Sequence, residues 1–410
     1  MNTKNTKLEK LHEFITKIPK SDLHVHLDGS VRIPTIIELS KAANLPLPSY
    51  TENGMNELVF KDHYASLFEY LEGFKHILPI MQTPENLERI SYEFALDNIN
   101  EGVCYVEVKL APHLHINANQ DIDTIILSVN KGLNRAKMEY NQRPEVKSGE
   151  VPEFNYGIII CAMRFFTKGF SKFLDAFLDE HKYSISETVY SMASYELVKN
   201  CIQIKEKYAL PIVAFDLVGS EAQNPPQHHK AAYDYALQNL LPTTVHAGEA
   251  AGPENIFTAL LELHPERIGH GTLLFAKNQI LDQKITEQNK EEYIKRLVQY
   301  IAAKRITIEV CLTSNLQTLP FIKKIKDHPL AQMLNANLST AICTDNRTFS
   351  KTSVTKELML AIQNFDLSNS AIKDIIAYSF KRSFYPGTYA EKRNYVKKVM
   401  ARYELLANNE

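Results

Sequence analysis

The chain has 410 residues, of which 44% are hydrophobic and 23% are charged, the composition of an ordinary globular protein. Its formal net charge is only −2, so no strong overall field attracts nucleic acid or an anionic membrane, and we expect neither as a partner. No run approaches the roughly 20 apolar residues that span a bilayer, and the polar N-terminal segment lacks the apolar core of a signal peptide.

The cysteines predict a reducing environment. Their number is odd, no CxxC pair is present, and most lie in apolar runs; they are Cys104, Cys161, Cys201, Cys311 and Cys343. We therefore expect buried, reduced thiols and a cytoplasmic protein.

Short β-branched runs alternate with helical segments along the chain. The predicted strands, in chain order, are Asp22–Leu27, Tyr105–Leu110, Tyr156–Ala162, Ile212–Leu217, Thr243–Ala247, Arg267–His270, Thr307–Leu312 and Ser339–Thr344. Helical spacing is clearest in Glu85–Asn100, Ala231–Leu240, Glu254–Leu263, Lys290–Ala303 and Ile322–Leu334. Eight strands alternating with helices predict an α/β fold, the (β/α)8 TIM barrel. No linker divides the chain, so residues 1–410 are expected to form a single domain.

Two segments depart from this alternation. Residues 141–153 have the least pattern and are expected to form an exposed loop. The excursion between the first two strands is longer than one helix requires, and its surplus, about residues 50–82, is helical and rich in aromatic residues. We expect this surplus to form a helical lid over the mouth of the barrel.

Barrel enzymes place their chemistry at the carboxyl ends of the strands. The first strand ends in HVH (24–26), and residues two apart on a strand point to the same side. The fifth, sixth and eighth strands end in HAGE (246–249), GHG (269–271) and TDNR (344–347). Histidine nitrogens and a carboxylate that meet in one mouth suit a zinc ion with a position open for water.

Other histidines carry a weaker signal. His113 and His115 follow the second strand and are as consistent with a structural role. His228 and His229 follow two prolines and are expected in an exposed loop. The fourth strand ends in DLVG (216–219) without the carbamylated lysine that two-metal barrels of this type use, which favours one metal.

Several blocks in the same order resemble the adenosine deaminase family of the amidohydrolase superfamily. The likeness runs from about Pro19 to Phe384. The blocks are PKSDLHVHLDGS (19–30), EGVCYVEVKLAPH (101–113), CAMR (161–164), FDLVGSE (215–221), TVHAGE (244–249), RIGHGT (267–272) and CTDN (343–346). The resemblance implies zinc-dependent deamination of adenosine or 2′-deoxyadenosine to inosine or 2′-deoxyinosine and ammonia, a step of purine salvage.

The resemblance also implies roles for single residues. One zinc ion per chain would be held by His24, His26, His246 and Asp345. Glu249 would give a proton to purine N1, and its pKa should be raised in a closed site. His270 would hold and polarise the attacking water, and Asp345 would also accept the water's proton.

On the substrate side, the resemblance implies that the Gly219 N–H meets purine N3 and that Asp28 binds the ribose 5′-hydroxyl. Asn346 stands where the family usually has an aspartate that meets N7, and its amide can donate without being protonated. The remaining residues that match the nucleoside site are His26, Leu67, Tyr70, Leu71, Phe74 and Met163. Arg347 is expected to pair with a structural carboxylate, the alternative being contact with an acidic ligand.

Three other functions stay open from the sequence. A sister deaminase of adenine or aminodeoxyfutalosine would keep the zinc and acid residues and differ in the sugar pocket. An inactive binding protein of the same fold would have lost a ligand or the acid, and none is missing here. A barrel hydrolase of amides or phosphoesters would not need the HAGE block.

Overall fold

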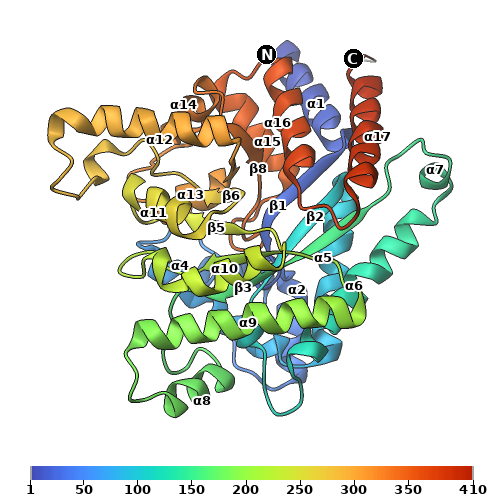
Figure 1. Cartoon of the computed structure of the whole chain (residues 1–410). Helices are drawn as coiled ribbons and strands as arrows, with labels where there is room; N and C mark the ends of the chain where they lie inside the picture. The colour runs from blue at the N-terminus through green and yellow to red at the C-terminus, as the bar shows by residue number, and fades with distance from the viewer. Residues whose placement is uncertain (1, 409–410) are drawn as a thin grey trace.

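The computed structural model describes residues 2–408, apart from the side chains of residues 2–7 and of Phe68. Parallel strands occupy the centre of the molecule and helices surround them (Figure 1). The strands are β1 Lys20–His26, β2 Val103–Leu110, β3 Asn155–Met163, β4 Ile212–Val218, β5 Thr244–Ala247, β6 Arg267–His270, β7 Thr307–Val310 and β8 Ser339–Ile342. All eight predicted strands are confirmed, although β7 and β8 end slightly earlier than predicted.

Backbone pairing closes these strands into a barrel. Strands β1–β4 form one parallel sheet and β5–β8 form another. Phe215 pairs with Thr243 at one junction and Val25 pairs with Asp345 at the other. At the second junction the His26 N–H donates to the Asp345 carbonyl at 2.7 Å. The predicted (β/α)8 barrel is therefore confirmed, and its closure brings the ends of β1 and β8 together.

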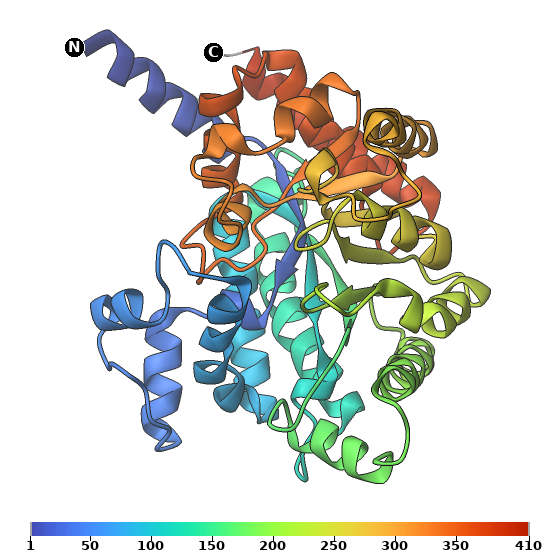
Figure 2. The same ribbon diagram turned by 90° about the vertical axis from the view of Figure 1, so that its left-hand side faces the viewer.

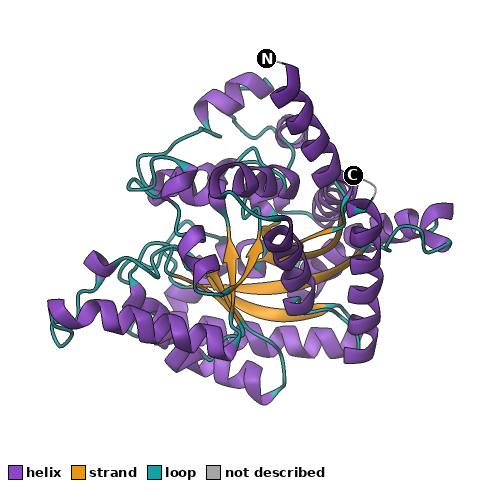
Figure 3. Ribbon diagram, turned by 90° about the horizontal axis from the view of Figure 1, so that it is seen from above, coloured by secondary structure: helices purple, strands orange, loops and turns teal. Residues whose placement is uncertain are grey.

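Helices cover the outside of the barrel, as Figure 3 shows. They are α5 Pro84–Asn100, α6 Ile122–Asn141, α8 Lys172–Glu180, α9 Ser186–Tyr208, α10 Lys230–Gln238, α11 Pro253–Leu263, α12 Lys290–Lys304, α13 Leu312–Thr318, α14 Leu330–Asn335, α15 Val354–Phe365 and α16 Asn369–Arg382. The helix predicted over Ile322–Leu334 is wrong, because only a 3-10 turn, Ile325–Asp327, precedes α14. Pro329 lies between the two, where its ring disfavours a continuous helix.

The two terminal helices pack together outside the barrel. They are α1 Asn2–Lys17 and α17 Tyr389–Ala407, and the rings of Phe14 and Tyr403 meet with centroids 6.0 Å apart. The first turns of α1 extend away from the body (Figure 2). No described helix has the length and apolarity needed to cross a membrane.

The part of the long excursion that precedes α5 contains only short helices. They are α2 Ile33–Ala42, α3 Glu52–Leu58 and α4 Leu67–Glu72, followed by 3-10 turns at Gly73–His76 and Leu78–Met81. The helical content predicted for residues 50–82 is thus present. The segment 141–153 is mostly exposed, as predicted, and contains a single short helix, α7 Pro144–Lys147.

Candidate metal and catalytic site

Imidazole rings from three strands meet at the carboxyl end of the barrel. Two groups of potential metal-ligating atoms share His24: one joins it to His246 and His270, the other to His26 and Asp345. The Nε2 atoms of His26 and His246 are 3.3 Å apart, and Asp345 Oδ1 lies 3.5 Å from His26 Nε2. Residues more than 300 positions apart in the chain therefore share one small volume.

Buried carboxylates below the cluster orient two of these rings. Glu309 Oε2 lies 2.6 Å from His24 Nδ1, and Asp216 Oδ2 lies 3.1 Å from His246 Nδ1. A carboxylate can only accept, so each Nδ1 carries the proton, and each Nε2 turns its lone pair into the cluster.

A single lysine joins the two carboxylates. Lys109 Nζ lies 2.5 Å from Asp216 Oδ2 and 3.4 Å from Glu309 Oε2, and all three side chains are fully buried. Arg267 adds a second cation, with Nε 2.7 Å from Glu309 Oε1. The cations hold the pKa of Asp216 and Glu309 well below its usual range despite burial, so both acceptors stay ionised.

The donor set suits a divalent metal ion. His24 Nε2 is buried without a hydrogen-bond partner among the described residues, which is costly unless another group occupies its lone pair. Neighbouring imidazoles hold the pKa of Asp345 far below its usual value, so the carboxylate is ionised. Three imidazole nitrogens and one carboxylate oxygen form a set that binds zinc well.

Glu249 lies on the loop after β5, beside this cluster. Its Oε1 is 3.8 Å from His270 Nε2. Burial and the nearby Asp345 and Glu221 carboxylates raise the pKa of Glu249 to about 8. At neutral pH this side chain therefore holds a proton that it can donate.

The carboxylate of Glu221 fixes the loop that carries Glu249. It accepts the backbone N–H groups of Gly248, Glu249 and Ala250 at 2.7–2.9 Å. It also accepts from Ala251 N–H at 3.1 Å and from the Asn255 amide. Gly248 turns the chain here with φ +74°, and an added Cβ would meet Ile256.

A hydrogen-bond chain determines which nitrogen of His270 is protonated. The amide oxygen of Asn315 accepts from the Thr272 hydroxyl at 2.9 Å and lies 3.2 Å from His328 Nε2. The amide nitrogen of Asn315 therefore faces His270, at 3.1 Å from its Nδ1 atom. His270 Nδ1 is then an acceptor, and its Nε2–H points as a donor toward Glu249 and the cluster. Burial and neighbouring His24 hold the pKa of His270 low, so the ring is neutral.

The residues predicted to contact substrate lie around the same mouth. Gly219 has φ +101°, a conformation that disfavours other residues, and Met163 packs next to it. Burial raises the pKa of half-buried Asp28 to about 6. The buried Asn346 packs against Gly29, where a larger side chain would collide with its amide.

The helices after β1 contribute an aromatic group to this side of the barrel. The ring of Phe74 stacks on Phe349 with centroids 4.6 Å apart, and Tyr70 lies 4.9 Å from Phe349. Leu67 and Leu71 are partly buried against the same core.

Several other predictions have a clear outcome. The expectation that Arg347 pairs with a structural carboxylate is confirmed, because its guanidinium lies 2.7 Å from Glu101 Oε1. All five cysteines are buried and free, as predicted. The exposed position predicted for His229 is wrong. Its ring is buried and bonds the Ser194 hydroxyl and the Arg164 carbonyl, a contact with α9 that local sequence does not reveal.

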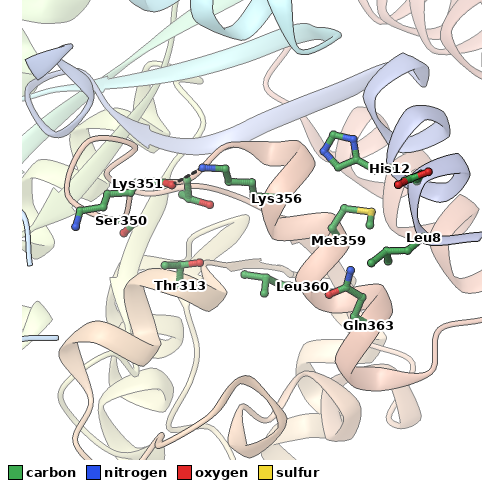
Figure 4. Close-up of a pocket in the computed structure, with 11 residues that line it drawn as sticks. Leu8, His12, Thr313, Ser350, Lys351, Lys356, Met359, Leu360 and Gln363 are labelled. Atoms are coloured by element: carbon green, nitrogen blue, oxygen red, sulfur yellow. Dashed lines mark hydrogen bonds between the residues drawn. The ribbon is translucent and has the colours of Figure 1, made fainter. Parts of the chain in front are cut away.

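A separate hollow lies away from this cluster. It measures about 690 Å³ and is formed by α1, α15 and the loop after β8 (Figure 4). Leu8, Met359 and Leu360 give it an apolar wall, and none of the predicted ligands lines it.

Sequence reasoning missed the residues beneath and beside the cluster. Asp216 and Glu309 are the single charges in their strands, and Lys109 shares β2 with Glu107; these charges within buried strands were the available signal. A charge inside a buried strand requires a partner, but the pattern does not say which one.

A closed (β/α)8 barrel with a histidine-rich group and a carboxylate at the carboxyl ends of its strands is the architecture of the metal-dependent amidohydrolases. A family model described as adenosine deaminase matches residues 19–402. An adenosine deaminase of Vibrio atlanticus is 33% identical to this chain, over 90% of this chain and 94% of the relative. An adenosine deaminase of Clostridium botulinum is also 33% identical, over 94% of this chain and 98% of the relative. The chain thus belongs to the adenosine deaminase family and is a hydrolase acting on carbon–nitrogen bonds.

Solved structures share the fold at lower identity. Adenine deaminase from Arthrobacter aurescens superposes with a TM-score of 0.71, at 20% identity over 94% of this chain and 98% of that one. The N6-mAMP deaminase of Arabidopsis superposes with a TM-score of 0.69, at 23% identity over 95% of this chain and 99% of that one. An amidohydrolase of Burkholderia ambifaria with bound zinc superposes with a TM-score of 0.73, at 18% identity over 97% of this chain and 94% of that one.

Proposed function

We propose that this enzyme removes the 6-amino group of adenosine or 2′-deoxyadenosine by hydrolysis, with one zinc ion per chain, and releases ammonia. The observation that carries the proposal is the protonated acid Glu249 beside a cluster of imidazoles in which His24 Nε2 lacks a hydrogen-bond partner among the described residues. Hydrolytic deamination needs both parts, because the ring must gain a proton as the nucleophile attacks.

We assign the metal to His24, His26, His246 and Asp345, whose donor atoms face one another. When bound there, zinc acts as a Lewis acid that can lower the pKa of a water from about 15.7 to about 7. Asp216 and Glu309 keep the two buried imidazoles in the tautomer that ligation requires.

The other side chains position the reactants. Glu249 gives its proton to purine N1, so that the ring accepts the electron pair as C6 becomes tetrahedral. The Nε2–H of His270 donates to the attacking water and sets its direction of approach, while Asp345 accepts the proton that the water loses. The leaving amino group takes up the proton held by Asp345, and the C6–N bond breaks to release ammonia. The C6 hydroxyl returns a proton to Glu249 as it becomes a carbonyl, so both carboxyl groups regain their starting state.

Substrate recognition uses the rim of the mouth. The Gly219 N–H meets purine N3, the Asn346 amide meets N7, and Asp28 binds the ribose 5′-hydroxyl. Leu67, Phe74 and Met163 line the base and exclude water, and residues 50–82 serve as the lid.

The charge pattern at this rim favours a nucleoside over a nucleotide. Arg347, the cation nearest in sequence to the predicted ligands, is paired with Glu101, while Lys61 pairs with Glu69 and Lys351 with Asp62. A 5′-phosphate would need a cation without a carboxylate partner.

Steady-state rates of the zinc-loaded protein test the substrate assignment. The substrates are adenosine, 2′-deoxyadenosine, adenine, aminodeoxyfutalosine and N6-methyl-AMP, with ammonia release and product identity measured for each. We expect the two nucleosides to have the highest kcat/KM. A large preference for another compound would overturn the substrate, and a product other than an inosine-type compound would overturn the reaction.

A further inference from the structure

A second hollow, of about 440 Å³, lies at the other end of the barrel strands. It is lined by the C-terminal ends of α11, α12 and α16, by the start of β6 and by Lys392 of α17. Because Arg267 begins β6 and His270 ends it, this basic pocket lies at the end of the strand opposite the imidazole cluster.

Cations without ion-pair partners surround the basic pocket. They are Lys304, Arg305, Lys381, Arg382 and Lys392. Within residues 2–408 none of them forms an ion pair, and the Nε of Arg382 is buried without a hydrogen-bond acceptor. The carboxylate of Glu266, the single acidic side chain in the described lining, already accepts from the Thr243 N–H at 2.7 Å. Like charges this close repel one another, in a chain whose net charge is −2.

The helix ends explain only part of this charge. Three helices end at the basic pocket, and each contributes about half a negative charge at its C-terminus. Together with Glu266 they offset about half of the five positive charges, so the pocket stays positive. Moreover, the side chains of Lys304, Arg305 and Lys381 make no hydrogen bond to a helix-end carbonyl among the described residues, whereas such a bond is the usual sign of a capping side chain.

We propose that the basic pocket binds a small anion that carries two or more phosphate groups. Its volume is in the range of small-molecule sites, about 300–1,000 Å³. Lysines supply point charges and the two arginines supply paired donors, a combination that suits phosphate oxygens. The ring of Tyr300, which is 49% exposed, lines the same pocket and offers a face to an organic group of the ligand. A hollow in a chain of low net charge favours a small molecule over a nucleic acid, which needs an extended basic surface.

Isothermal titration of the zinc-loaded protein with tripolyphosphate and, separately, with CTP tests this proposal. CTP has no purine ring to compete for the imidazole cluster, so the two probes separate inorganic from nucleotide ligands. We compare the parent with the double variant Lys304→Glu and Lys381→Glu, whose side chains are exposed and outside the catalytic machinery. The matched control is Lys147→Glu with Lys182→Glu, which changes net charge equally at exposed sites elsewhere.

We expect the parent and the control to bind at least one probe, and the pocket variant to bind it roughly tenfold or more weakly. Lys304→Arg with Lys381→Arg should keep the affinity, because the charge is retained. Heat from chelation of zinc by either probe would be the same in every variant and cannot imitate this difference. Absence of binding of both probes to the parent, or equal affinity of the pocket variant, would overturn the proposal whatever the enzyme's substrate.

Discussion

The carboxyl ends of the strands and the segment after β1 are held by different kinds of contact. At the strand ends, buried charges fix each imidazole: Glu309 holds His24, Asp216 holds His246, and Lys109 joins the two carboxylates. Between residues 50 and 82, packing is mainly aromatic, as in the stack of Phe74 on Phe349. Buried charge pairs have strict geometry, whereas apolar contacts tolerate rearrangement. Substitutions at the strand ends should therefore have far larger effects than those in residues 50–82.

The largest effect is expected from Glu249→Gln. This change removes the proton that we assign to purine N1 and keeps the shape, so kcat should fall by about 10²–10⁴-fold. Zinc content measured by plasma emission should be unchanged, because Glu249 is not among the assigned ligands. Glu254→Gln, on the nearby helix α11, is the control. Activity within a few-fold of the parent would show that another group donates the proton.

Lys109→Met should weaken the support beneath the cluster. It leaves Asp216 and Glu309 buried with less compensating charge, and losing one partner of a buried pair costs about 3–5 kcal/mol. We expect a lower free energy of unfolding in urea and a loss of zinc on dialysis. Lys109→Arg keeps the charge and should retain more of both. If Lys109→Met kept the parent's stability and zinc affinity, the two carboxylates would not depend on this lysine.

Asn315→Asp should alter the tautomer of His270 and leave the metal in place. A carboxylate accepts from His270 Nδ1–H, so Nε2 would lose the proton that points toward the reacting water. We expect kcat to fall roughly 10–100-fold, the range for changes to groups that orient a site residue. Nitrogen NMR shifts of labelled histidine report the tautomer directly, and Thr272→Ser is the control that keeps the hydroxyl. An unchanged His270 spectrum would contradict the assigned chain of hydrogen bonds.

The pH profile of kcat should fall on the alkaline side. Glu249 acts in its protonated form, so activity is complete well below its raised pKa and is lost as pH rises through about 8. Above that value kcat should decrease about tenfold per pH unit. The residual activity of Glu249→Gln should lack this limb. An alkaline limb that persists in the variant belongs to a different group.

The smallest effect is expected from Phe74→Ala in residues 50–82, the segment that we propose as a lid. An aromatic pair contributes about 0.5–1.5 kcal/mol beyond its buried area, so KM for adenosine should rise roughly two- to tenfold. Zinc content and the free energy of unfolding should change little. A loss of kcat as large as that of Glu249→Gln would mean that residues 50–82 position reacting groups, and the contrast between the two regions would fail.

The sequence was informative wherever a local pattern determines structure. All eight strands follow from β-branched runs, and the convergence of His24, His26, His246 and Asp345 follows from their positions at strand ends. Contacts between distant segments could not be predicted. Nothing near His229 in the sequence indicates that Ser194 of α9 will bury it. The spacing of residues 322–334 resembled a helix, although Pro329 divides it.

The partners of buried charges were hidden for the same reason. Lys109, Asp216 and Glu309 are separated by about 100 residues each, and only closure of the barrel brings them together. Glu221 belongs to a block that resembles the family. Its carboxylate fixes the loop of Glu249 by accepting hydrogen bonds from five donors, and only the folded chain brings these donors together.

Anomalous diffraction at the zinc edge, from crystals of the zinc-loaded protein, tests the central claim most directly. We predict a single strong peak at about 2.0–2.2 Å from the Nε2 atoms of His24, His26 and His246 and from a carboxylate oxygen of Asp345. Glu249 should stand beside that peak without coordinating it. A peak bound by other side chains, or two peaks in one mouth, would contradict the account.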